Sequence, residues 1–235
     1  MIKEAIKYIV DLAKPDVQEI GYETYSDKPL YRISFSPKAE AIKMTTLSSL
    51  VDYIKSSYDE MGNMIIHVQS PTKVVMFSAL NDEREREYMV EVNAQLPNFA
   101  FDRFIDHENF CINLQSKFVD NDDRALLLKF AGTVEAGTIA EYGDDGVTQK
   151  ATIKTGIASK SEAVVPNPVS LKPFRTFIEV EQPSSQFVFR MQGNGSVQCA
   201  LYEADGGAWK LYAMYNIKKY LETALAGIGG IIVIC

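Results

Sequence analysis

The sequence has little histidine and little cysteine, and this shortage removes most metal and thiol chemistry. Among 235 residues there are 2 histidines and 3 cysteines. The cysteines form neither a CxxC pair nor an even-numbered set, which favours free thiols in a reducing compartment over a disulfide framework. They are Cys111, Cys199 and Cys235. Only Asp106, His107 and Glu108 gather possible metal ligands, and neighbouring helix positions point about 100° apart, so no metal site is expected.

Long apolar runs and an excess of positive charge are missing too. The longest apolar run, Ile231 to Cys235, is far shorter than the roughly 20 residues that a membrane-spanning helix needs. The formal net charge of −7 is opposite in sign to the broad basic surface that grips nucleic acid, although it leaves room for a local basic face. We therefore expect a soluble protein of the cytoplasm that makes no membrane contact.

The usual catalytic patterns are absent or have a simpler local explanation. There is no GxSxG motif around Ser184 or Ser185, and no motif places a histidine beside Cys111. Gly206 and Gly207 lie between two predicted strands, where they indicate a hairpin turn and not a phosphate-binding loop. Two acid pairs are explained as a helix cap and a turn: Asp122-Asp123 and Asp144-Asp145. We predict no enzyme activity and no cofactor. The alternative is a metal-dependent nuclease or phosphodiesterase whose acids are scattered in the sequence.

Residues 1–97 combine helical and strand patterns. Apolar residues from Ile2 to Ala13 recur at helical spacing and predict an amphipathic helix that ends before Pro15. A second helix is expected after a Thr45 or Thr46 cap and before Gly62, with one apolar side formed by Leu47, Leu50, Val51, Ile54 and Tyr58. Strands are expected at Tyr22–Tyr25, Leu30–Phe35, Met64–Val68, Lys73–Leu80 and Glu83–Val92.

Residues 98–225 begin with two helices and continue with strands. The helices are predicted from Asp102 to Phe118 and from an Asn121 cap to Gly132. Strand-like runs are Thr138–Tyr142, Val147–Ile157, Thr176–Val180, Gln186–Met191, Val197–Glu203 and Trp209–Tyr215, separated by turn signals at Asp144–Gly146, Gly193–Gly195 and Asp205–Gly207 and by a long loop at Ser161–Pro173. A helix at Asn216–Leu225 follows. The expected class is α+β, with a mixed α/β first half, a helical pair and an antiparallel sheet closed by a helix, either as two parts or as one continuous domain.

Arginines beside aromatic residues are the best candidates for ligand binding. Arg84, Arg86 and Tyr88 are expected to share one face of a strand. An arginine beside an aromatic ring can stack on a base or hold a phosphate. The alternative is pairing with glutamates on neighbouring strands. Two further arginines stand beside phenylalanines in the sequence: Arg175 next to Phe174, and Arg190 next to Phe189.

Residues 226–235 are predicted to form a flexible, apolar arm. Ala226 to Gly230 contains three glycines and is expected to be a flexible joint. A strand-forming run follows, composed of Ile231, Ile232, Val233, Ile234 and Cys235. Burying its four branched side chains contributes roughly 6–10 kcal/mol. Ordering five residues costs roughly 5–10 kcal/mol. The arm is therefore expected to add to a sheet edge of a neighbouring subunit or of its own chain, and otherwise to stay disordered.

The order of these segments resembles the YfdQ-like family, a set of uncharacterised proteins of tailed phages and prophages. The resemblance begins at Thr45 to Ile54 (TTLSSLVDYI) and continues through Val74–Leu80 and Phe101 to Asp106 (FDRFID). It includes the acid-capped, leucine-rich helix and ends near Tyr215, so it covers most of the chain as a pattern of elements. The short N-terminal lead and the isoleucine-rich tail depart from it. The family brings no catalytic residues.

The resemblance implies a phage protein that acts in the cytoplasm of an infected bacterium. We expect it to be non-enzymatic, to assemble into a homo-oligomer by exchange of the C-terminal arm, and to act by binding. Its partner besides itself is expected to be a host protein, a nucleotide signal or single-stranded nucleic acid. The implied role is neutralisation of a host defence, or support of phage replication or recombination. A purely structural, self-assembling component is the remaining alternative.

Overall fold

A computed structural model describes residues 2–30, 38–136, 138–144, 149–155, 159–164, 167–192 and 197–235. These residues contain five helices and fourteen strands, which confirms the predicted α+β class. The chain divides into a first unit, Met1–Ala39, and a second unit, Glu40–Cys235. The predicted boundary at residue 97 falls inside the second unit. In the described part of the chain, no helix is long and apolar enough to cross a lipid bilayer.

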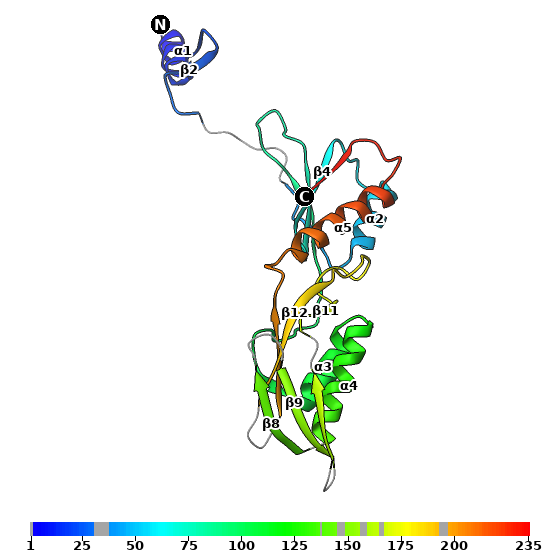
Figure 1. Ribbon diagram of the computed structural model, residues 1–235. Coiled ribbons are helices and arrows are strands. Elements are labelled where there is room, and N and C mark those ends of the chain that lie inside the picture. The colour runs from blue at the N-terminus through cyan, green and yellow to red at the C-terminus, as the bar shows by residue number, and fades with distance from the viewer. Residues whose placement is uncertain are drawn as a thin grey trace. The chain divides into compact units, whose positions relative to one another are not determined.

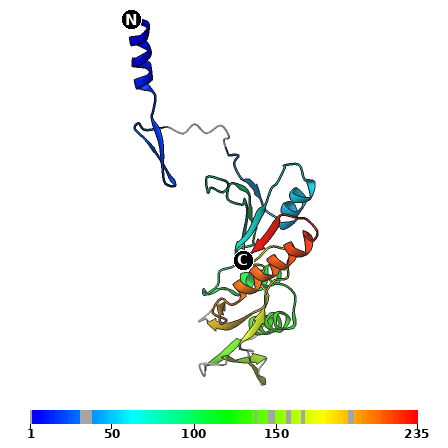
Figure 2. The same ribbon diagram turned by 90° about the horizontal axis from the view of Figure 1, so that it is seen from above.

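The described part of the first unit contains one helix and one hairpin (Figure 2). Helix α1 spans Ile2–Ala13 as predicted, and strand β1 (Val17–Ile20) pairs antiparallel with β2 (Glu23–Ser26). The predicted strand at Tyr22–Tyr25 corresponds to β2, while its partner β1 was not predicted. The other predicted strand, Leu30–Phe35, lies almost wholly outside the described residues. Two polar contacts tie the hairpin to the end of α1, because the Lys28 ammonium donates to the backbone oxygens of Leu12 and Lys14.

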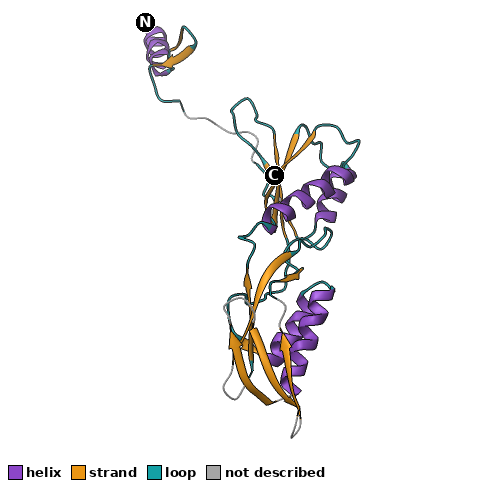
Figure 3. Cartoon of the chain, viewed as in Figure 1, coloured by secondary structure: helices purple, strands orange, loops and turns teal. Residues whose placement is uncertain are grey.

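A five-stranded sheet in the second unit carries the first of two cores. Its strand order is β14-β4-β5-β6-β3, with β3 at Ile42–Met44, β4 at Met64–Ser70, β5 at Lys73–Ser78, β6 at Tyr88–Asn93 and β14 at Ile231–Ile234. Helices α2 (Leu47–Ser56) and α5 (Trp209–Ala224) pack on the same side of these strands (Figures 1 and 3). Alternate strand residues such as Ile66, Met76 and Val90 therefore face the helices and are fully buried.

Helix α2 begins and ends for local reasons. The Thr46 hydroxyl accepts a hydrogen bond from the Ser49 N–H at 3.2 Å, which confirms one of the two predicted caps. The helix ends earlier than Gly62, because Ser57 takes a left-handed conformation with φ of 49°. Tyr58 then points to solvent with 89% of its surface exposed, so its predicted place on the apolar side of the helix was wrong.

The second core lies between a four-stranded antiparallel sheet and a helical pair. The sheet order is β11-β12-β13-β7, with β7 at Ile105–Asp106, β11 at Val169–Leu171, β12 at Ser185–Gln192 and β13 at Gln198–Glu203. Helices α3 (His107–Lys117) and α4 (Asp122–Ala136) pack against each other, as the predicted helical pair required. Helix α3 starts later than predicted, because the Asp106 side chain caps it by accepting from the Asn109 N–H.

A separate three-stranded antiparallel sheet joins β8 (Thr138–Asp144), β9 (Gln149–Thr155) and β10 (Ser159–Val164). β8 and β9 match predicted strands. The long loop predicted at Ser161–Pro173 was wrong, since β11 and most of β10 fall within it. Two predicted turn signals, Asp144–Gly146 and Gly193–Gly195, lie outside the described residues except for Asp144, which ends β8.

Two strand predictions in the last third of the chain were wrong. Residues Thr176–Val180 form turns and not a strand, because a buried glutamine side chain takes up their backbone hydrogen bonds. Residues Trp209–Tyr215 are the first part of helix α5. The glycines before them, with positive φ of 62° and 81°, therefore join a strand to a helix and are not a hairpin turn. The aromatic residues there favour strands in isolation, and tertiary packing overrides that preference.

The C-terminal strand β14 is the edge strand of the first sheet, next to β4. It runs parallel to β4 of the same chain, with Ile231 opposite Met64 and Ile234 opposite His67. Val233 faces the first core with 9% exposure, while Ile232 faces away with 63% exposure. The arm is thus docked on a sheet of its own chain, which was one of the predicted alternatives.

We expect Val233→Asp to lower the free energy of unfolding by about 2–4 kcal/mol, because it places a charge in the first core. The neighbouring change Ile232→Asp on the exposed side is expected to cost less than about 1 kcal/mol. Urea denaturation of both variants measures the difference. Equal losses would contradict the observed docking of this strand.

Candidate binding site

The predicted arginine and tyrosine face at residues 84–88 is not a strand face. Strand β6 begins only at Tyr88. Arg84 lies in a turn with φ of 59°, held by the Asn81 side chain, which accepts from two backbone N–H groups. Arg86 and Tyr88 both contact the ring of Phe77. The Arg86 Cζ atom lies 5.1 Å from the centre of that ring, and the centre of the Tyr88 ring lies 5.4 Å from it. Arg86 also donates to the Ser78 carbonyl, so its guanidinium is partly engaged within the chain.

Arg175, another predicted ligand residue, is committed to the interior. It is 8% exposed, donates to the Glu203 carboxylate and to the Ser185 hydroxyl, and stacks 3.8 Å from the centre of the Trp209 ring. Burial lowers the pKa of Arg175, and the charge of Glu203 opposes that effect. Through these contacts Arg175 connects β12, β13 and α5, so its guanidinium is engaged within the fold and does not serve as a site for an anionic ligand.

Arg190 lies on β12 opposite Ala200 and donates from Nη1 to the backbone oxygen of Phe189. It is separated in the fold from the residue 84–88 turn, which follows β5 in the other sheet. The sequence-predicted arginines therefore belong to three different environments. They do not form one ligand site.

The segment between β11 and β12 contains a loop with an internal clamp, which we call the clamped loop (Phe174–Gln182). The side chain of Gln182 is 5% exposed and lies inside the loop. Its Oε1 accepts from the N–H groups of Arg175 and Thr176 at 3.0 and 3.2 Å, and its Nε2 donates to the Phe177 carbonyl at 3.0 Å. Thr176 also donates to the carbonyl of Pro71 in the β4–β5 turn. The loop is therefore held in one shape although it lacks helix or strand.

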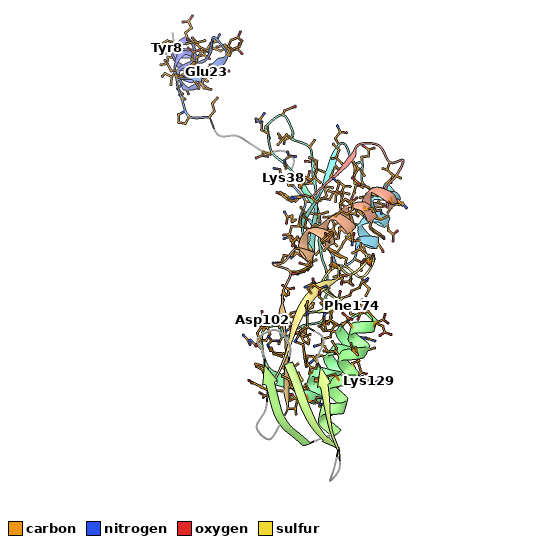
Figure 4. All side chains as sticks on the ribbon, in the orientation of Figure 1. Tyr8, Glu23, Lys38, Asp102, Lys129 and Phe174 are labelled. Carbon is orange, nitrogen blue, oxygen red and sulfur yellow. The ribbon has the colours of Figure 1, made fainter. Side chains whose placement is uncertain are left out.

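A cavity of about 340 Å³ lies beside the clamped loop. It is bounded by the start of α2, by the chain after β6 and by the end of α3. Phe174, labelled in Figure 4, belongs to the wall that the loop contributes. Its apolar lining consists of Ala94, Leu96, Pro97, Phe174, Phe177 and Ile178, and its polar lining of Thr45, Thr46, Gln95, Ser116, Thr176 and Glu179. This volume and mixture are typical of a small-ligand site.

Glu179 is the lining residue with a net charge. One carboxylate oxygen, Oε1, accepts from the backbone N–H of Ser48 at 3.1 Å and from its hydroxyl at 3.3 Å. These contacts place the carboxylate at the N-terminus of α2, where a negative charge is favoured. The other oxygen, Oε2, is buried and has no hydrogen-bond partner among the described residues. A buried acceptor without a donor is unfavourable, so Glu179 would gain from turning this oxygen toward a donor brought by a ligand.

A second hollow of about 400 Å³ adjoins Glu179. It is lined by Glu179, Val180 and Glu181 from the clamped loop and by residues of α5 such as Lys219 and Tyr220. Glu181 is bound to Lys172 at 2.8 Å, and this hydrogen bond lowers the pKa of its carboxyl group. The clamped loop thus separates two hollows that share one carboxylate.

One contact that bears on enzyme chemistry was not predicted. Cys111 Sγ lies 3.5 Å from Nε2 of His107, one turn earlier on α3. The four-residue spacing on a helix was the signal that could have revealed this pair. Cys111 packs against the second core, where burial, and to a lesser degree Cys111, raises the pKa of Cys199 to about 12. Among the described residues, no three metal-ligating side chains lie together.

Comparisons with family models, with curated proteins and with solved structures found no match to this chain. The resemblance to the YfdQ-like family therefore stays a prediction from the sequence.

Proposed function

We propose that this is a non-enzymatic binding protein that holds an apolar group bearing a positive charge in the cavity beside the clamped loop. The observation that carries the proposal is the carboxylate of Glu179, which lines an otherwise uncharged cavity and keeps one buried oxygen without a donor. An ammonium or guanidinium group would supply that donor in a charge-assisted hydrogen bond once the Glu179 side chain turns Oε2 toward the cavity. The rings of Phe174 and Phe177 offer apolar contact to the rest of the occupant.

The lining argues against the anionic ligands considered from the sequence. It contains no lysine, arginine or histidine, whereas a phosphate needs cationic or well-aligned N–H donors. A nucleotide signal or single-stranded nucleic acid therefore fits this cavity poorly. The Glu179 carboxylate of the cavity favours a positively charged ligand.

A basic segment of a partner protein is the occupant that we favour. Two hollows share Glu179, so an extended segment could fill both while it crosses the carboxylate. The net charge of −7 would attract such a segment over a distance. In the phage setting that the resemblance implies, the partner would be a host protein bound in the bacterial cytoplasm, in line with neutralisation of a defence.

A matched pair of small probes tests the charge preference. We expect 2-phenylethylamine to bind about tenfold more tightly than 2-phenylethanol, since the two share an apolar body and only the amine can form a charged hydrogen bond. Glu179→Gln keeps an acceptor for Ser48 and removes the charge, so it should abolish the preference. Saturation-transfer NMR titrations measure all four combinations.

Glu181→Gln is the matched control, because Glu181 lines only the neighbouring hollow and is 73% exposed. It should leave the preference unchanged. A peptide such as acetyl-Leu-Lys-Leu-amide then separates the two possible sources: tighter binding than the free amine supports a protein segment, and weaker binding points to a small organic cation. Equal binding of amine and alcohol to the unchanged protein would refute the proposal.

A further inference from the structure

We infer that helix α1 is a self-association surface that packs against α1 of other copies of this chain. Its apolar residues are Ile2, Ala5, Ile6, Ile9, Val10, Leu12 and Ala13. At about 100° per residue they cover about 160° of the helix circumference, and the charged residues occupy the opposite side. The large ones are all exposed, by 53% to 81%. A continuous apolar face is therefore left uncovered by the rest of the first unit.

The first unit cannot cover this face from within. None of its described residues is buried, including those of the hairpin, where Val17 and Ile20 are at least half exposed. An isolated helix of twelve residues is marginal in water, and so is an isolated two-stranded hairpin. The contacts of Lys28 with the end of α1 give the unit a defined arrangement but contribute little burial. An external apolar surface is needed to make the unit stable.

The pattern of α1 favours another copy of itself as that surface. Ile2, Ile6, Ile9 and Ala13 follow each other at intervals of four, three and four residues, which is the spacing of a helix-packing seam. Ala5, Val10 and Leu12 widen this seam on both sides. A seam widened in this way suits a bundle in which each helix touches two neighbours, and it exceeds what a two-stranded coil would cover.

The charges of α1 also favour another copy of this helix, and not a lipid surface, as the partner of its apolar face. Its polar side mixes Lys3 and Lys7 with Glu4 and Asp11, and Asp11 pairs with Lys14 at 2.8 Å. Helices that lie on anionic membranes carry a polar side rich in lysine and arginine. Mixed signs instead allow copies of one helix to pack side by side without net repulsion. We therefore assign α1 to an assembly of at least three chains.

The experiment compares two double variants of the full chain by multi-angle light scattering. The unchanged protein should have at least three times the mass of one 26.3 kDa chain. Ile6→Ser with Ile9→Ser should reduce the mass to that of a single chain. Lys7→Ser with Asp11→Ser introduces the same two serines on the polar side, removes one charge of each sign, and should leave the assembly intact. Fluorescence of Trp209, the single tryptophan, checks that the second unit stays folded in every variant.

Two results would overturn the inference. One is a single-chain mass for the unchanged protein at 100 µM, the concentration we would use. The other is an assembly that survives the Ile6 and Ile9 changes. A single-chain protein that instead binds vesicles of equal phosphatidylcholine and phosphatidylserine would identify a membrane as the occupant of α1. These results are independent of the Glu179 cavity, which lies in the other unit.

Discussion

Replacing Arg175 with alanine is expected to lower the free energy of unfolding by about 3–5 kcal/mol, the largest effect of any single change considered. The guanidinium is almost fully buried, and it is bonded to Glu203 and Ser185 and stacked on Trp209. Without it, the Glu203 carboxylate would lose its ion pair and the nearby Asp205 its positive neighbour. Truncation of one partner is costly because the other charge stays partly buried and unpaired.

The same network makes the loss depend on pH. Burial acts to raise the pKa of Asp205, but hydrogen bonds from Ser185 and Gly207 and the charge of Arg175 outweigh it, so the pKa is lowered from 3.8. A lowered folded pKa contributes stability that is present above the unfolded pKa and is lost as pH falls through the folded value. Arg175→Ala removes one of the lowering causes, so the variant should lose less stability than the unchanged protein on going from pH 7 to pH 3.

Urea denaturation followed by far-ultraviolet circular dichroism at both pH values measures this effect. Arg175→Lys is the control, because lysine keeps the charge and loses the planar fork that stacks on Trp209. The free energy of unfolding of the lysine variant should lie between those of the unchanged protein and the alanine variant. If Arg175→Ala lowered the free energy of unfolding by less than about 1 kcal/mol, this network would not be an important source of stability.

Gln182→Met is expected to cost about 2–4 kcal/mol and to abolish amine binding in the cavity. Methionine has a similar length but cannot bond to the N–H groups of Arg175 and Thr176 or to the carbonyl of Phe177. Each buried backbone group left without a partner costs about 1–3 kcal/mol, less where water can enter. The loop would then lose the shape that places Glu179 at the cavity.

Gln186→Met is the matched control for this change. Gln186 lies four residues further along the chain, in β12, and its side chain is exposed, so its replacement should change stability by less than about 0.5 kcal/mol. Urea denaturation and the 2-phenylethylamine titration measure the two effects separately. If Gln182→Met kept full affinity for the amine, the clamp would not be what positions the site.

Local signals in the sequence predicted the elements whose causes are local. Helix α2 followed from the Thr46 cap and the apolar spacing of Leu47 to Ile54, and strands β4 and β5 followed from two apolar runs. Trp209 was assigned to a strand because aromatic residues favour strands, while its true environment is set by Arg175, far away in the sequence. Gln182 gave no signal at all, because a glutamine that bonds to the backbone looks like any polar loop residue.

The candidate site shows the same limit. Ser48, Gln95 and Glu179 come from three separate segments, and no spacing rule relates them. The arginines that stood out in the sequence were instead used within the fold. What the sequence could indicate was the absence of a broad basic surface, since the net charge is −7.

The parallel pairing of β14 with β4 has a consequence for synthesis of the protein. β4 leaves the ribosome early, and the whole second core is made before β14 follows. At roughly 5–20 residues per second, the apolar edge of β4 stays without its neighbour for about 10–30 s. During that time an open edge can pair with other chains. The first sheet, although it begins near residue 42, is therefore completed after the second core, and a nascent chain needs protection at β4 until β14 has been made.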